Sequence, residues 1–306
     1  MEKIETLHAG NFRIIQDTDE FRFGIDAVLL ADFASFKKNS HVVDLCTGNG
    51  IVPLLMAARV FGDSRKTASS ETVHEPVAVA ESVAHQTGAT VEPSAHQTGA
   101  DAELLEHRVF LAQGEKQPKN AMQPVRFTGV EINHHAVDMA RRSVVLNNLE
   151  KTIEIVECDI KNVFSALPKN CADVVTANPP YMPFSHGKKC PSQDMAAARH
   201  EVLCCLEDVV LAAAGLLNSN GRFFMIHRPE RLAEIMESLV RNELEPKRLR
   251  FIHPYEGTPP TMVLIEAKKC AAHGLVVEKP FIVYSGKKIY SPEMEQIYGR
   301  AESKCE

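Results

Sequence analysis

The chain has 306 residues, a hydrophobic content of 44% and a formal net charge of −6 at pH 7. This length suits one large α/β domain or two small ones. The negative charge argues against an attraction of the whole protein to nucleic acid, although a local basic face is compatible with it. No apolar run approaches the roughly 18 residues that cross a bilayer, and the first residues lack the apolar core of a secretory signal, so we expect no membrane association.

Eight cysteines are scattered along the sequence without a Cys-x-x-Cys pair. This spacing argues against a zinc site and against a disulfide framework, and it favours reduced thiols in the cytosol. We therefore expect a cytoplasmic protein without a metal site. We also expect its cysteines to lie in the core or on the surface without a chemical role.

The first forty residues contain one clear predicted helix, 25–36, in which apolar residues recur at helical spacing. From residue 41 onward, short apolar runs alternate with helical patterns. The predicted strands cover 41–45, 127–132, 153–158, 173–177, 222–227, 248–253, 261–267 and 281–284. The other predicted helices cover 51–60, a stretch ending near 147, 200–217, 229–241 and a few residues after 292. Gly221 is expected to cap the C-terminal end of 200–217. This alternation is typical of a mostly parallel, doubly wound sheet, and 248–253 with 261–267 predict an antiparallel hairpin at its edge.

Residues 61–124 interrupt the alternation. They are rich in Ser, Thr, Ala, Glu and Gly and poor in aromatic residues, which favours a disordered or loosely ordered insertion, with one short helix allowed at 101–112. We expect this insertion to be dispensable for ligand binding, although it could recruit a partner. The predicted organisation is an N-terminal helical segment (1–40), a main α/β domain (41–268) that contains the insertion, and a C-terminal extension (269–306).

Four polar residues stand at or just after the ends of four successive predicted strands: Asp44, Glu131, Asp159 and Asn178. Ligands of doubly wound sheets bind outside the carboxyl ends of the strands. We therefore expect these four side chains to border one crevice.

The last of them opens the turn Asn178-Pro179-Pro180-Tyr181. Proline cannot continue a central strand, because it has no N–H to donate. The turn therefore presents an amide oxygen and a freed backbone carbonyl as two acceptors, with an aromatic ring beside them. This arrangement suits a planar NH2 group, such as the exocyclic amine of adenine or the amide of glutamine. The structural alternative is a rigid turn at the end of a strand.

The loop Asp44-x-x-x-Gly48-x-Gly50 lies between a predicted strand and a predicted helix, where glycines let a ligand approach the backbone. It lacks the third glycine of the dinucleotide fingerprint, and taken alone it is equally compatible with a tight turn. Glu131 is suited to binding ribose hydroxyls and Asp159 to accepting from an adenine amine. A ligand with amino-acid, ribose and adenine parts fits these acids better than NAD does, which points to S-adenosylmethionine.

These residues resemble the class I methyltransferases that act on amino groups. Three further segments narrow the resemblance to the bacterial tRNA adenine-N6 methyltransferase family: 23–31, 198–201 and 262–267. The similarity covers most of residues 7–290 apart from 61–124. It implies a Rossmann-like sheet of seven strands, S-adenosylmethionine as cofactor, and tRNA as substrate. The Asn-Pro-Pro-Tyr motif is also found in methyltransferases that act on guanine-like amines and on glutamine, so it does not decide the substrate.

The resemblance also implies roles for individual residues. The implied cofactor-binding residues are Phe23, Asp26, Asp44, Thr47, Gly48, Gly50, Glu131, Asp159 and Asn178. The implied catalytic residues are Asn178, Pro179, Pro180 and Tyr181, with no metal. Asn178 and the Pro179 carbonyl would accept from the target amine, and Tyr181 would stack on the target base. No general base is needed, because the proton can leave after methyl transfer.

Two alternatives stay open. One is a glutamine methyltransferase that acts on a protein such as a release factor. Such enzymes carry a helical N-terminal domain of roughly 70–80 residues, whereas only about forty residues precede Asp44 here. The other alternative is a non-catalytic RNA-binding protein that retains the fold.

Several exposed polar groups allow two interpretations. The basic groups Lys188-Lys189, Lys247-Arg248-Arg250 and Lys287-Lys288 are either solvated charges or, if they border the crevice, phosphate contacts. Arg199, His200 and Glu201 are expected to begin a helix rather than to catalyse.

Overall fold

The computed structural model describes residues 1–7, 11–17, 23–68, 124–180 and 204–298, with backbone alone for 62–68. All of them belong to one compact unit of the chain. Most of the expected insertion, the Tyr181 ring, Lys188-Lys189 and residues 198–201 lie outside these ranges. Among the described residues, no helix combines the length and the apolarity that crossing a membrane requires.

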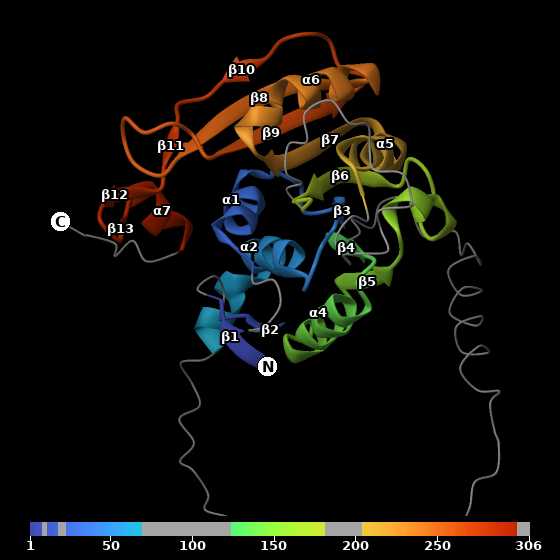
Figure 1. The fold of residues 1–306 in the computed structure, drawn as a ribbon. Coiled ribbons are helices and arrows are strands. Elements are labelled where there is room, and N and C mark those ends of the chain that lie inside the picture. The colour runs from blue at the N-terminus through green and yellow to red at the C-terminus, as the bar shows by residue number, and fades with distance from the viewer. Residues whose placement is uncertain (8–10, 18–22, 69–123, 181–203, 299–306) are drawn as a thin grey trace, which may run out of the picture. The chain divides into compact units, whose positions relative to one another are not determined.

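The main sheet has a parallel centre and an antiparallel end (Figure 1). Its parallel strands are β3 (His41–Leu45), β4 (Arg126–Glu131), β5 (Ile153–Glu157), β6 (Ala172–Ala177) and β7 (Leu217–His227). Beyond β7, strand β9 (Met262–Lys269) is antiparallel to both β7 and β8 (Leu244–His253). The order β8-β9-β7-β6-β3-β4-β5 confirms the predicted mostly parallel sheet with its hairpin. Two short strands, β10 (Val276–Val277) and β11 (Phe281–Ile282), extend the sheet by pairing with β8.

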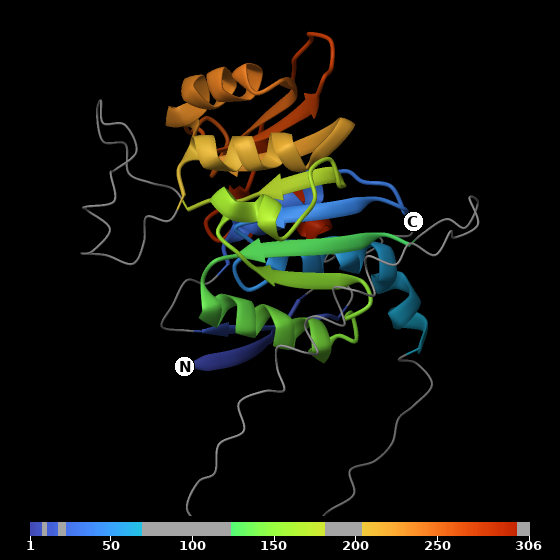
Figure 2. The same ribbon diagram turned by 90° about the vertical axis from the view of Figure 1, so that its right-hand side faces the viewer.

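Helices cover both faces of this sheet, because its strands bury side chains on both sides. One face packs against α1 (Ile25–Phe33), α2 (Ile51–Ala68) and α4 (His134–Leu146). The other packs against α5 (Leu206–Leu216), α6 (Leu232–Arg241) and the 3-10 helix η1 (Ile160–Ser165); Figure 2 views the molecule from this side. A further 3-10 turn, η3 (Pro229–Arg231), precedes α6. Neighbouring residues of one strand belong to opposite cores, as Phe223 and Phe224 do. The doubly wound prediction is therefore confirmed.

The N-terminal segment contains a hairpin that the sequence analysis did not predict, β1 (Glu2–Thr6) and β2 (Arg13–Asp17). The hairpin is held by α4. The Ile15 amide donates to the Ser143 hydroxyl at 2.9 Å, and Asn147 exchanges two hydrogen bonds with the Arg13 backbone at 2.8 and 2.6 Å. A two-stranded hairpin is marginal by itself, so its stability here comes from a helix about 130 residues away in the chain.

Several predicted boundaries were wrong. The helix α1 ends at Phe33, because Ala34 is extended. The helix α5 is capped by Cys205, so it does not include the predicted Cys204, and it ends at Leu216. Strand β7 begins immediately afterwards, so Gly221 lies in an irregular part of that strand and does not cap the helix. The helix α2 continues to Ala68, into the predicted insertion.

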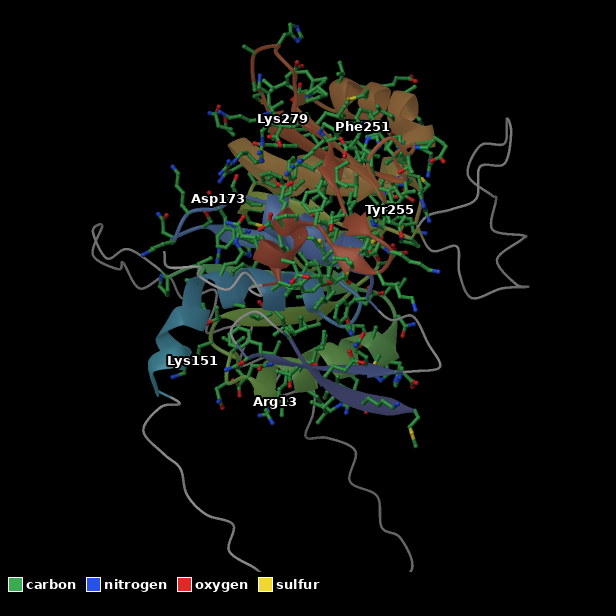
Figure 3. The ribbon with its side chains drawn as sticks, turned by 90° about the vertical axis from the view of Figure 1, so that its left-hand side faces the viewer. Arg13, Lys151, Asp173, Phe251, Tyr255 and Lys279 are labelled. Carbon is green, nitrogen blue, oxygen red and sulfur yellow. The ribbon has the colours of Figure 1, made fainter. Side chains whose placement is uncertain are left out.

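The C-terminal extension folds beside the carboxyl end of β8. After β11 it forms the hairpin β12 (Tyr284–Gly286) and β13 (Ile289–Tyr290), followed by the predicted short helix, α7 (Pro292–Ile297). The Val283 and Tyr284 amides donate to the carbonyls of His253 and Pro254 at 2.9 Å each. Figure 3 labels Tyr255, which follows β8, and Asp173, near the start of β6, at opposite edges of the sheet. The β12–β13 hairpin therefore leaves the sheet at its carboxyl edge.

Candidate active site

The register of the parallel strands brings three of the predicted site residues to one edge of the sheet. Asp44 pairs with Gly129 of β4 on one side and with Thr176 of β6 on the other. Glu131 ends β4, and Asn178 follows β6. The chain runs from β3 outward through β4 and β5 and then returns to the other side of β3 with β6. Asp44 and Asn178 therefore flank the switch point, where α/β sheets bind ligands.

Asp44 is a buried carboxyl group with one unsatisfied oxygen. The residue is only 2% exposed, and its Oδ1 accepts a hydrogen bond from the Thr176 hydroxyl at 2.5 Å. Burial raises the pKa of Asp44 to about 7, the hydroxyls of Thr176 and Thr47 offset part of this shift, and the Glu131 charge adds to it. Asp44 Oδ2 and the Thr47 hydroxyl are buried without a hydrogen-bond partner of normal geometry among the described residues. Such atoms are costly unless a ligand or water satisfies them.

The loop after β3 turns back over the end of β4. Cys46, Gly48 and Gly50 have positive φ angles of 57°, 56° and 80°. The Thr47 amide donates to the Val130 carbonyl at 3.1 Å. A Cβ on Gly50 would lie 3.2 Å from the Cβ of Ala140, whereas a Cβ on Gly48 would meet nothing within 4 Å. Gly50 thus allows close packing on α4, and Gly48 borders open space.

Glu131 is anchored by three backbone amides. Its Oε2 accepts from the Gly48 amide at 2.8 Å, and its Oε1 accepts from the amides of Ile132 and Asn133 at 2.9 and 3.0 Å. An ionised carboxylate has about four acceptor sites. The three bonds leave room for one more donor, on Oε2. The carboxylate is therefore oriented before any ligand arrives, and it joins the glycine loop to the end of β4.

Asp159 lies beyond the end of β5, on the same edge. Its Oδ1 accepts from the Lys161 amide at 2.9 Å and so caps η1, and its Oδ2 is 3.4 Å from Lys161 Nζ. The Asp159 side chain is 23% exposed and that of Lys161 is 48% exposed. An exposed ion pair of this kind is weak, so it leaves Oδ2 available to another donor.

The turn after β6 begins in the described part of the chain. Asn178 is half-buried, Pro179 is buried and Pro180 is exposed, and all three follow the last ladder residue, Ala177. The two prolines end the strand as predicted. Tyr181 lies outside the described residues.

The predicted residues at the start of α1 are tied to the glycine loop through β2. The Phe23 amide donates to Gln16 Oε1 at 3.3 Å, and Asn49 Nδ2 donates to the neighbouring Ile15 carbonyl at 3.2 Å. The buried Asp26 accepts from the Ala27 amide at 3.0 Å. A Cβ on Gly24 would lie 2.5 Å from Asp26 Oδ1, so only glycine leaves this carboxylate in place.

Three positioning residues are not evident from the sequence: Thr176, Gln16 and Asn49. Thr176 lay within a predicted strand, and its partner Asp44 is 132 residues away in the sequence. Gln16 accepts from a backbone amide seven residues away, and Asn49 donates to a backbone carbonyl 34 residues away. Neither contact leaves a periodic pattern or motif in the sequence.

The residues present fit S-adenosylmethionine. Its amino group and sulfonium are cationic, and the buried Asp44 lacks a donor for one oxygen. The open space over Gly48 is where a ligand could lie against the backbone without a Cβ in the way. No group of side chains suited to a metal ion occurs in the described ranges.

The basic groups differ in their availability. Arg248 pairs with Glu266 and with Glu278, the latter at 2.9 Å, and Arg250 pairs with Glu293 at 2.8 Å. Lys247 Nζ donates to the Ala272 carbonyl at 2.9 Å. These three residues hold the C-terminal extension. By contrast, Lys287 and Lys288 are exposed at the turn of the β12–β13 hairpin.

Comparison with known proteins finds similar chains among the methyltransferases. The family model described as "Methyltransferase small domain" matches residues 117–248. A protein of Phocaeicola vulgatus is 23% identical over 282 residues, which cover 91% of this chain and 92% of that protein. One from Porphyromonas gingivalis is 26% identical over 174 residues, 55% of this chain and 67% of that protein. Both are named tRNA1(Val) (adenine(37)-N6)-methyltransferase.

Among solved structures, a predicted O-methyltransferase, Atu636 from Agrobacterium tumefaciens, has the same fold. It superposes with a TM-score of 0.57 at 20% identity and covers 90% of this chain and 97% of its own. The sheet order, the family model and the full-length relatives together confirm the fold, the cofactor and the resemblance expected from the sequence. The chain is a class I S-adenosylmethionine-dependent methyltransferase, and over most of its length it is similar to proteins named tRNA1(Val) (adenine(37)-N6)-methyltransferase.

Proposed function

We propose that this protein transfers a methyl group from S-adenosylmethionine to the N6 amine of an adenine in a cytoplasmic tRNA. The observation that carries the proposal is the position of the Asn178-Pro179-Pro180 turn. It follows the strand next to β3, so its acceptors adjoin the edge where Asp44 lies near the end of β3 and Glu131 ends β4. The name of the Phocaeicola vulgatus relative, which matches over most of both chains, favours adenine over the amide of glutamine.

The proposed cofactor site follows the edge of the sheet. Asp44, Thr47 and the backbone of Gly48 and Gly50 bind the methionine part, which Phe23 and Asp26 line. Glu131 binds the ribose through the free acceptor site on Oε2, and Asp159 accepts from the adenine of the cofactor. Bound S-adenosylmethionine supplies a methyl group made electrophilic by its sulfonium.

The proposed catalysis depends on positioning rather than on a general base. The adenine amine is a poor nucleophile, because its lone pair is delocalised into the ring. Asn178 Oδ1 and the Pro179 carbonyl each accept a hydrogen bond from one N–H of the amine. These two bonds favour a pyramidal nitrogen whose lone pair points at the methyl group. The proton leaves after transfer. Tyr181 stacks on the target base, which offsets part of the roughly few kcal/mol needed to splay it out of the RNA.

The decisive experiment uses the full chain with methyl-labelled S-adenosylmethionine and tRNA from cells that lack this protein. We expect label in tRNA and N6-methyladenosine by nucleoside mass analysis. The Asn178→Ala variant should transfer methyl groups about 10²- to 10³-fold more slowly, because one preorganised acceptor is removed. Asn39→Ala is the matched control, since Asn39 is exposed in the turn before β3.

Two other results would replace the proposal. Label in a release factor but not in tRNA would identify a glutamine methyltransferase. No label in either substrate, together with no cofactor binding, would leave a non-catalytic RNA-binding protein that retains the fold.

We also propose that the methyltransferase domain, 41–268, keeps its cofactor site without the insertion. The helix α2 reaches Ala68 and β4 begins at Arg126, so residues 70–122 can be replaced by a short linker without cutting either element. The shortened protein should bind S-adenosylmethionine as tightly as the full chain. A large loss of affinity would refute this organisation, and retained affinity leaves the insertion free to bind a partner.

A further inference from the structure

Two thiols from distant parts of the sequence meet beside the glycine loop. The Sγ atoms of Cys46 and Cys204 are 3.8 Å apart, although the residues are 158 positions apart in the chain. Both residues are half-buried, so a small oxidant can reach them. Cys46 lies two residues after Asp44, and Cys204 lies just before α5.

Both thiols sit on anchored backbone. The residues after Cys46 are held by β4, since the Thr47 amide donates to Val130 and the Gly48 amide to Glu131. Next to Cys204, the Cys205 amide donates to Asp208 Oδ2 at 2.9 Å, which caps α5. A covalent link between the two sulfurs would therefore join the glycine loop to the start of α5.

The two thiols also differ in acidity. A hydrogen bond from Cys46 lowers the pKa of the Cys204 thiol, although burial opposes this shift. The same contact, together with burial, raises the pKa of Cys46 well above its usual value. Because the thiolate is the reactive form, Cys204 is the attacking sulfur and Cys46 the resolving one.

We propose that Cys46 and Cys204 are a redox modification site, in which a hydroperoxide converts the two thiols into a disulfide that weakens S-adenosylmethionine binding. The Cys204 thiolate attacks one peroxide oxygen; the S–O bond forms, the O–O bond breaks, and the departing oxygen takes a proton to leave as water or alcohol. The Cys46 sulfur then attacks the sulfenic sulfur, the S–S bond forms, and the hydroxide leaves with the Cys46 proton as water. The thiols are oxidised by two electrons and the peroxide is reduced by two.

The effect on the cofactor follows from geometry, and it rests on the cofactor site proposed above. The sulfurs must approach from 3.8 Å to the bond length of about 2.05 Å. Cys46 has a left-handed backbone inside the loop that carries Gly48, so its displacement disturbs the Gly48–Glu131 hydrogen bond. Linkage is reciprocal: a disulfide that weakens cofactor binding must itself be destabilised by the cofactor to the same extent.

The test treats the full chain with hydrogen peroxide, maps the linkage by mass spectrometry and measures S-adenosylmethionine affinity by calorimetry before and after. We expect a Cys46–Cys204 linkage and an affinity at least about tenfold lower, restored by dithiothreitol. In glutathione redox buffers, S-adenosylmethionine should then raise the midpoint potential of the disulfide. The expected shift is about 30 mV for each tenfold difference in affinity between the reduced and the oxidised protein.

Two variants separate this pair from general oxidation. Cys204→Ser should keep its affinity through peroxide treatment. Cys171→Ser should respond like the natural chain, since Cys171 is equally half-buried but precedes β6 at the opposite edge. Absence of the Cys46–Cys204 linkage, or equal affinity in both redox states, would overturn the redox proposal but not the proposed cofactor site. A reduced protein that binds no S-adenosylmethionine would overturn the cofactor site as well.

Discussion

The carboxylate of Glu131 accepts a hydrogen bond from the amide of Gly48 at 2.8 Å, which joins the loop after β3 to the end of β4. Its other oxygen accepts from the Ile132 and Asn133 amides. The Glu131 side chain therefore holds the glycine loop in place, and the three amides in turn fix the orientation of its carboxylate. Because of this double role, a substitution of Glu131 should disturb the glycine loop as well as the proposed ribose contact.

Glu131→Gln should weaken S-adenosylmethionine binding. The new NH2 group would face a backbone amide, so two donors would meet and that hydrogen bond would be lost. A hydrogen bond to a charged group contributes about 1.5 to 3 kcal/mol. We expect a loss of affinity of about tenfold or more, measured by calorimetry. Glu157→Gln is the control, because Glu157 is the register partner of Glu131 on β5 and its carboxylate faces the exposed His134. Equal losses in both variants would contradict the assignment.

The affinity for S-adenosylmethionine should depend on pH through Asp44. In the free protein the pKa of this carboxyl is about 7, so below that value it is mostly protonated. A cationic ligand favours the ionised form and must release the proton on binding. Affinity should rise by up to about tenfold per pH unit until about pH 7 and then level off. Calorimetry in buffers of different ionisation enthalpy would detect the released proton. Asp44→Asn should bind more weakly and without this slope.

The stability of the free protein should depend on the same group with the opposite trend. The folded pKa of about 7 lies above the unfolded value of about 3.9. The contribution of Asp44 is therefore fully present below about pH 4 and is lost as the pH rises to about 7. The difference in pKa sets an upper limit of about 4 kcal/mol. Chemical denaturation across this range should show the natural chain losing stability relative to Asp44→Asn. Parallel curves would show that Asp44 is not buried in this state.

Gly48→Ala should affect ligand binding, and Gly257→Ala should not. Both glycines have positive φ, 56° and 73°, and a Cβ added to either would meet no atom within 4 Å. The left-handed backbone should therefore lower the folding stability of each alanine variant by about 1–2 kcal/mol. Only at Gly48 does the added methyl enter the proposed cofactor space. Thermal melts paired with calorimetry would separate the two effects, and unchanged S-adenosylmethionine affinity in Gly48→Ala would move the cofactor elsewhere.

Lys287 and Lys288 should contribute to tRNA binding. Both are exposed on the hairpin that leaves the sheet at its carboxyl edge. Their double substitution by Glu should weaken tRNA binding. It should also make the plot of log K against log salt less steep, by about 1 for each phosphate that the variant no longer neutralises. Lys37 and Lys38, exposed before β3 at the opposite edge, provide the matched double substitution. If both pairs weaken binding equally, the contribution is a general charge effect and not a local one.

The fold was predictable wherever a local pattern carried the information. The all-buried run of β3 and the runs of β4 and β6 were recognised because parallel strands covered on both faces are almost wholly apolar. The β1–β2 hairpin was missed because its order comes from Ser143 on α4 and from Asn147, the residue that caps this helix. The end of α5 was misplaced because Gly221 looked like a helix cap, whereas the chain passes from Leu216 directly into β7.

The amino-acid sequence by itself determined which chemical groups stand at the ends of the strands: the glycine loop, the carboxylates of Asp44, Glu131 and Asp159, and the prolines that stop β6 after Ala177. These features are local, because they depend only on strand pattern and residue type. Only the tertiary structure decided that β6 lies beside β3, which brings Thr176 to Asp44 and Cys204 to Cys46. It also decided the protonation of Asp44, since a pKa depends on burial and neighbouring charges that are brought together only when the chain folds.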